Sequence, residues 1–119
     1  MKIVIADDSE MLRERIKSSL KEIDNVEIIG EATNGNEAIK IILETNPDFV
    51  LLDIRMPELN GIEVLKKMKE NGSKSKTCIF TNYPYSQYKV KCMEEGADYF
   101  FDKNKDFQEI KSLIAKLAH

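Results

Sequence analysis

The chain has 119 residues, of which 42% are hydrophobic and 33% are charged, and its formal net charge is -3. This length suits one domain with a substantial core, and the slightly acidic balance offers no basic face of the kind that binds nucleic acid. No apolar run approaches the roughly 20 residues of a membrane span, and the first residues enter a strand pattern instead of a signal peptide. We therefore expect one cytoplasmic domain over residues 1–119, with no direct contact to nucleic acid or membrane.

Five strand patterns alternate with five helix patterns, which is typical of a parallel sheet wrapped by helices. We expect strands over residues 2–6, 26–32, 48–53, 77–81 and 98–102. The third pattern is apolar throughout, as in a central strand that is buried on both faces. The sequence thus predicts a doubly wound, flavodoxin-like α/β fold.

Four of the five expected helices carry an apolar face, and most of the five carry a start or stop signal. The first helix follows Asp8 or Ser9, and Gly96 is placed to end the fourth. Residue pairs spaced as capping boxes precede the second, third and fifth helices: Asn34 with Glu37, Asn60 with Glu63, and Asp106 with Glu109. The residues expected to face the core include Ile16, Leu20, Ile23, Ala38, Ile41, Ile42, Val64, Leu65, Met68, Ile110, Leu113, Ile114 and Leu117.

The two cysteines, Cys78 and Cys92, lie in an expected strand and an expected helix. They are not at metal-ligand spacing. We interpret them as reduced, buried, small apolar residues of a cytoplasmic protein.

Polar side chains occur at the carboxyl ends of four expected strands. Asp7 and Asp8 follow the first, Asp53 ends the third, Thr81 ends the fourth and Lys103 follows the fifth. Ligand chemistry in an open parallel sheet gathers beyond these ends, so the five side chains should meet in one pocket. Clustered carboxylates repel one another and call for a cation, and their hard oxygens suit Mg²⁺. Each residue alone could be a helix cap, a turn residue or a solvated side chain, but their joint occurrence favours a site for a phosphoryl group on a carboxylate.

These motifs resemble the receiver domain of bacterial two-component response regulators over essentially the whole chain. The matching residues are Asp7-Asp8 followed by Ser9, the loop Asp53-Ile54-Arg55-Met56-Pro57 with Gly61 four residues further, Thr81, Gly96-Ala97-Asp98, and Lys103. The resemblance implies a sheet of order 2-1-3-4-5 and makes Asp53 the phosphoacceptor. It implies that Asp8, Asp53 and the backbone carbonyl of Arg55 bind Mg²⁺, that Asp7 acts partly through water, and that Lys103 and Thr81 contact the phosphoryl oxygens.

The resemblance also implies a switch and two interaction surfaces. Phe100 matches the family's switch aromatic, although a plain core aromatic is the alternative. The output surface would be the fourth helix, fifth strand and fifth helix, with Tyr85, Tyr88 and Tyr99 as exposed aromatics for an unspecified output protein. The donor would be a phosphohistidine on a sensor histidine kinase or a histidine phosphotransfer protein. It would dock on the first helix at Met11, Leu12 and Arg15, with core packing as the alternative for Leu12.

The implied role is a phosphoacceptor signalling domain, not an enzyme apart from Mg²⁺-dependent self-phosphorylation and self-dephosphorylation, and either a monomer or a phosphorylation-dependent dimer. The chain shows no DNA-binding or enzymatic segment, so we expect a stand-alone receiver of the chemotaxis or sporulation type, or one cut from a larger protein. It departs from the family pattern at Asn104, where many members have proline, and at Phe100, which lacks a tyrosine hydroxyl. Arg55 and Tyr83 are large residues at positions where the family tunes phosphate hydrolysis.

Three other functions are weighed against this one. A receiver-like docking domain that works without phosphate usually lacks one of the acids or the lysine, and all are present here. A flavodoxin-type carrier needs a phosphate-cradling loop after the first strand, where this chain has Asp7-Asp8-Ser9-Glu10. A phosphatase that uses an aspartyl phosphate needs a cap or substrate pocket, for which 119 residues leave little room.

Overall fold

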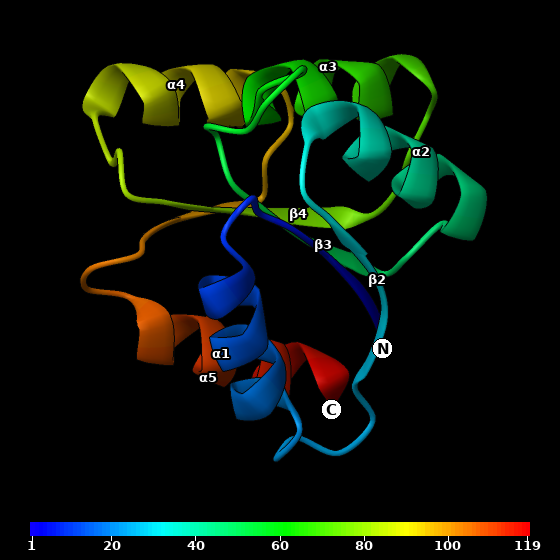
Figure 1. Ribbon diagram of the computed structural model, residues 1–119, viewed down its shortest axis with the longest axis vertical. Helices are drawn as coiled ribbons and strands as arrows, with labels where there is room; N and C mark the ends of the chain where they lie inside the picture. Colours follow the sequence, from blue (N-terminus) through cyan, green and yellow to red (C-terminus); the bar gives the residue numbers. More distant parts are fainter.

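Five parallel strands form one sheet in the order β2-β1-β3-β4-β5, which confirms the expected fold. The computed structural model describes residues 1–119. The strands are β1 (Lys2–Ala6), β2 (Glu27–Ala32), β3 (Phe49–Leu52), β4 (Lys76–Thr81) and β5 (Tyr99–Asp102). The helices are α1 (Glu10–Leu20), α2 (Gly35–Thr45), α3 (Gly61–Glu70), α4 (Ser86–Glu94) and α5 (Phe107–Ala118). Helices α2, α3 and α4 cover one face of the sheet, and α1 and α5 cover the other (Figure 1).

Each face of the sheet is the floor of a separate apolar core. All four residues of β3 are buried, and their side chains alternate between the two cores. Val50 and Leu52 pack with α2, α3 and α4, whereas Phe49 and Leu51 pack with α1 and α5. Burial on both faces explains why the sequence of this strand is apolar throughout. None of the helices has the length and apolar character that crossing a bilayer needs.

The starts of three helices follow the sequence signals. Ser9, Asn34 and Asn60 each accept a hydrogen bond from the backbone N–H three residues further on. Only the box at α3 is complete, because the Glu63 carboxylate accepts from the Asn60 N–H at 3.1 Å. At α2, Glu37 accepts instead from the amide that precedes the cap.

The expected cap of α5 is wrong. The Asp106 carboxylate accepts a hydrogen bond from the Asp102 N–H at 2.9 Å, so it closes the loop after β5 and makes no side-chain cap. Ile23 also lies beyond the end of α1, although it still packs against the core. Gly96 ends α4 as expected, with φ of 100° and a hydrogen bond from Ala97 N to the carbonyl of α4 five residues earlier. Both cysteines are free and buried.

Candidate functional site

Three carboxylates meet where β1 and β3 end. Asp7 and Asp8 follow β1, and Asp53 follows β3, where its N–H donates to the Ala6 carbonyl at 2.9 Å. One oxygen from each carboxylate lies within 4.8 Å of the others. Asp7 is 3% exposed and Asp53 is 6% exposed, whereas Asp8 is open to solvent. The structure therefore brings together the three acids that the sequence placed at one edge of the sheet.

The Lys103 ammonium lies between two of these acids. Its Nζ atom is 2.6 Å from Asp7 Oδ2 and 2.9 Å from Asp53 Oδ2, and its side chain is 8% exposed. Three carboxylates and one ammonium leave an excess of two negative charges when all are ionised. Hard oxygen donors with this excess charge suit Mg²⁺.

Burial and charge act in opposite directions on this pair. Burial raises the pKa of Asp53, and the Lys103 ammonium offsets this effect only in part. Burial alone would lower the pKa of Lys103, but hydrogen bonds and attraction from two carboxylates raise it. The negative charge of Asp7 also raises the pKa of Asp53, but burial is the larger cause.

Two glycines fix the loop that follows Asp53. A Cβ atom at Gly61 would lie 2.2 Å from the Asp53 carbonyl oxygen, and one at Gly35 would lie 1.9 Å from the Leu59 carbonyl oxygen. Gly61 N also donates to the Ile54 carbonyl at 2.7 Å. Any larger residue at either position would displace the loop, so the glycine in the sequence motif has a packing reason.

Thr81 and Phe100 lie on the same face of the sheet, toward α4. Thr81 ends β4 and is fully buried, and its Oγ1 accepts a hydrogen bond from Tyr83 N at 3.0 Å. Phe100 is half-buried, pairs with Ile79 of β4 in the sheet register, and packs against the core under α2, α3 and α4. The predicted switch residues thus lie on neighbouring strands, and the register partner of Thr81 is Asp102, two residues along β5 from Phe100.

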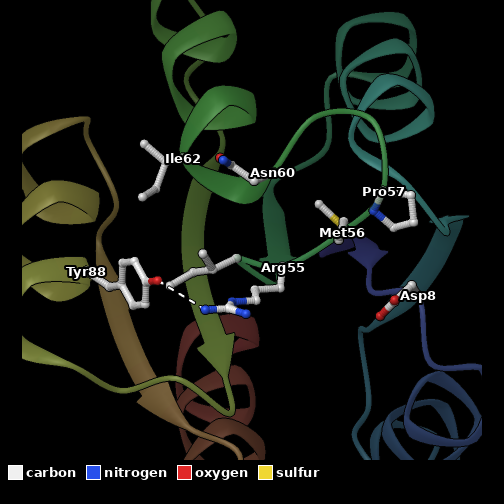
Figure 2. A pocket seen from close by; sticks show the side chains of 8 residues that line it. Asp8, Arg55, Met56, Pro57, Asn60, Ile62 and Tyr88 are labelled. Atoms are coloured by element: carbon white, nitrogen blue, oxygen red, sulfur yellow. Dashed lines mark hydrogen bonds between the residues drawn. The ribbon is translucent and has the colours of Figure 1, made fainter.

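Arg55 and Tyr83 contact each other instead of extending separately into solvent. The Arg55 Cζ atom lies 4.1 Å from the centre of the Tyr83 ring, and Nη2 donates to the Tyr88 hydroxyl at 3.3 Å. Figure 2 shows this side chain reaching from the loop after β3 toward Tyr88 on α4. The cavity beside it has a volume of about 500 Å³ and is lined by Asp8, Ile54, Arg55, Met56, Pro57, Asn60, Ile62 and Tyr88.

The residues expected to receive the kinase have different surroundings. Met11 is 83% exposed, Leu12 packs partly into the core, and the Arg15 guanidinium lies 4.0 Å over the Phe107 ring. A second cavity, of about 280 Å³, is lined by Ser9, Met11, Leu12, Arg15, Asn82, Lys103 and Asn104. Because Lys103 lines it, this cavity connects the acidic site with α1. The peptide bond between Lys103 and Asn104 is trans.

The three tyrosines expected on the output surface do not form one patch. Tyr85 is 52% exposed and Tyr88 is half-buried, and their rings lie 5.8 Å apart. Tyr99 packs in the other core, where its ring stacks with those of Phe49 and Phe101 at 6.5 Å each. Side-chain alternation along β5 explains this separation, because Tyr99 and Phe100 point to opposite faces.

Arg13, which no sequence pattern singled out, also reaches the site. Its Nη1 atom donates to the backbone carbonyl of Asp7 at 2.6 Å, and its Nε atom donates to Glu31 on β2 at 3.0 Å. Arg13 and Glu31 are 18 positions apart in the sequence, which is neither a helix nor a hairpin spacing, so no sequence pattern indicated the pair.

Comparison with known proteins gives a consistent picture. The family model described as the response regulator receiver domain matches residues 3–115. The transcriptional regulatory protein YhcZ of Bacillus subtilis is 34% identical over 110 residues, which cover 92% of this chain and 51% of YhcZ. The nitrate/nitrite response regulator NarL of Escherichia coli is 28% identical over 116 residues, which cover 98% of this chain and 54% of NarL.

The solved structures agree with the sequence matches. A DNA-binding response regulator of the LuxR family from Staphylococcus aureus has a TM-score of 0.90 and 31% identity, covering 99% of this chain and 98% of that one. The chain spans about half the length of the curated relatives it matches.

Proposed function

This chain belongs to the response regulator receiver family, and we propose that it is a cytoplasmic signalling domain controlled by phosphorylation of Asp53. The observation that carries the proposal is the placement of Asp53. Its carboxylate lies at the end of the central strand, next to two further carboxylates and the Lys103 ammonium. The donor is a phosphohistidine on a sensor histidine kinase or a histidine phosphotransfer protein.

The proposed cofactor is Mg²⁺. Asp8, Asp53 and the backbone carbonyl of Arg55 would hold it, and Asp7 would act partly through water. The fit rests on three converging carboxylates whose charge one ammonium does not balance. Mg²⁺ supplies a positive charge that neutralises the oxygens of the phosphoryl group during transfer.

Neighbouring groups hold the Asp53 carboxylate in one orientation for its attack on phosphorus. The Ile54 N–H holds Oδ1 at 2.8 Å, which fixes the rotation of the carboxylate, while Lys103 holds Oδ2. In the transfer, an Asp53 oxygen forms the new bond to phosphorus while the donor's nitrogen–phosphorus bond breaks, and the imidazole nitrogen keeps that electron pair. After the transfer, the Lys103 ammonium can pair with a phosphoryl oxygen.

Thr81 and Phe100 change position in response to the phosphoryl group. The Thr81 hydroxyl accepts from Tyr83 N and keeps its own proton for a phosphoryl oxygen. Movement of Thr81 toward that oxygen vacates buried space next to Phe100, which can then move inward and change the surface of α4, β5 and α5. Tyr85 and Tyr88 are the aromatic residues of this surface on the α4 side.

The lengths and names of the relatives indicate whether the receiver stands alone or is joined to another domain. The curated matches YhcZ and NarL are about twice as long, and YhcZ bears the name of a transcriptional regulatory protein. They favour a receiver joined to an output domain, which is one of the two forms that the sequence left open. The output partner would then be a segment of the same polypeptide.

Intact-mass spectrometry after incubation with acetyl phosphate and Mg²⁺ tests the proposal. We expect one added phosphoryl group in the wild type and none in Asp53→Asn. Asp48→Asn is the matched control, because this exposed aspartate lies at the opposite end of β3 and should not alter the addition. Asp8→Asn should slow the reaction and weaken Mg²⁺ binding. A folded wild type that gains no mass would instead support docking without phosphate.

A further inference from the structure

All four polar groups of Asp7 are held by neighbours. Its N–H donates to the Ala32 carbonyl at 3.0 Å, Oδ1 accepts from Ser9 N at 2.8 Å, and Oδ2 accepts from Lys103. Its backbone carbonyl accepts from Arg13 Nη1 at 2.6 Å. Arg13 is thus the side chain of α1 that ties the main chain of the first acid in place.

Arg13 is itself held in one orientation. Its side chain is 11% exposed, and its Nε atom donates to Glu31 Oε1 while Nη1 reaches Asp7. The planar guanidinium can make both bonds at once, which a lysine ammonium on a flexible stem cannot match in geometry. Glu31 also accepts from Lys17 at 2.8 Å, and this hydrogen bond lowers the pKa of Glu31 against the effect of burial. Lys17 in turn pairs with Glu14 at 2.7 Å.

We propose that Arg13 is a positioning residue of the acidic site and that Glu31, on the edge strand β2, acts on the site through Arg13. The inference rests on the proposed function, because Mg²⁺ binding is one of its readouts. Replacing a residue that hydrogen-bonds to a metal ligand and orients it usually lowers the metal affinity by about 10–100-fold. Arg13 has this relation to Asp7, and the tie to Glu31 brings β2 into the site.

Charge and positioning predict opposite effects for Arg13. Arg13 repels a cation bound at the three carboxylates, so if charge alone mattered, removing this positive charge would tighten cation binding. Releasing the Asp7 main chain would instead weaken binding, because the carboxylates would be less well ordered. The sign of the change therefore separates the two explanations.

The experiment compares Arg13→Gln, Glu31→Gln, the double variant and Glu14→Gln. Mg²⁺ affinity is measured by NMR titration, and hydrogen exchange of the Ser9 amide is measured without metal. We expect Arg13→Gln to raise the Mg²⁺ dissociation constant about 10-fold. It should also speed exchange of the Ser9 amide, which donates to Asp7.

Glu31→Gln should have a smaller effect of the same sign, and the double variant should be no weaker than Arg13→Gln, since Glu31 acts through Arg13. Glu14→Gln is the matched control, because it removes one charge from the same cluster without touching Arg13 or Glu31. It should bind Mg²⁺ like the wild type.

Unchanged or tighter binding by Arg13→Gln overturns the inference, as does equal weakening by Glu14→Gln. A wild type that binds no Mg²⁺ contradicts the proposed cofactor, and the metal-free Ser9 exchange then decides the positioning role by itself. If Arg13→Gln does not fold, Glu31→Gln carries the test with the same two readouts, and wild-type values in both would refute the role of Glu31.

Discussion

Replacing Lys103 by methionine removes the ammonium that Asp7 and Asp53 share and keeps a side chain of similar length. The two carboxylates, with side chains 5% and 7% exposed, would then face each other without a cation. Removing one partner of a buried ion pair costs about 3–5 kcal/mol, and we expect about 3 kcal/mol because exposed Asp8 opens the site to solvent. For a domain of this size the midpoint of thermal unfolding should fall by about 12 °C.

The pH dependence gives a second check on the same variant. Without Lys103, only the hydrogen bond from the Ile54 N–H offsets the burial that raises the pKa of Asp53, so its folded-state pKa should rise further. A carboxyl group whose pKa is raised by folding stabilises the protein at low pH and loses this contribution as pH rises through the folded value. The deficit of Lys103→Met should therefore be largest near neutral pH and shrink as Asp53 becomes protonated. Mg²⁺ should also reduce it, because a ligand of the folded state stabilises that state.

Urea unfolding followed by circular dichroism measures these differences at neutral and acidic pH, with and without Mg²⁺. Lys105→Met is the matched control, because Lys105 is an exposed lysine of the same loop and should change stability little. A neutral-pH deficit below about 0.5 kcal/mol, the usual range for surface substitutions, would refute the account of Lys103 as the shared counter-charge. A deficit that stays constant with pH would show that lost packing, not charge, is its cause.

Four further outcomes are expected. Met11→Glu should slow phosphoryl transfer from a histidine kinase but leave labelling by acetyl phosphate intact, and equal loss with both donors would argue against docking on α1. Thr81→Ala should keep phosphorylation but abolish the NMR shifts in α4 that accompany it, and shifts that persist unchanged would remove the proposed switch. If the stacked Arg55–Tyr83 pair occupies the approach to Asp53, as the family pattern implies, a double change of Arg55→Asn and Tyr83→Glu should release phosphate faster in a time course, and an equal rate would contradict occlusion. Burial raises the pKa of the Cys92 thiol to about 11, so alkylation at pH 8 should be slow and should accelerate with urea, whereas rapid labelling of the folded protein would contradict its burial.

Local sequence patterns were enough to predict most of the fold. The alternation of strands and helices, the apolar central strand and the glycine that ends α4 all depend on residues close in sequence, and the structure has each of them. The cap expected at Asp106 was wrong, although that prediction also rested on residues close in sequence. A nearby amide, that of Asp102, competes for its carboxylate, and residue spacing alone does not show which amide is closer.

The sequence by itself determined that three acids, a threonine and a lysine lie at the carboxyl ends of strands in one parallel sheet, since strand ends and the parallel order follow from periodicity and from the alternation of strands with helices. Only the tertiary structure decided how these groups are shared. Lys103 pairs with both Asp7 and Asp53, Arg55 lies on Tyr83 and bonds to Tyr88, and Arg13 ties α1 to the main chain of the first acid. The physical reason is that hydrogen bonds and ion pairs depend on distances of a few ångströms between segments far apart in the chain, and these distances are set by the packing of whole elements.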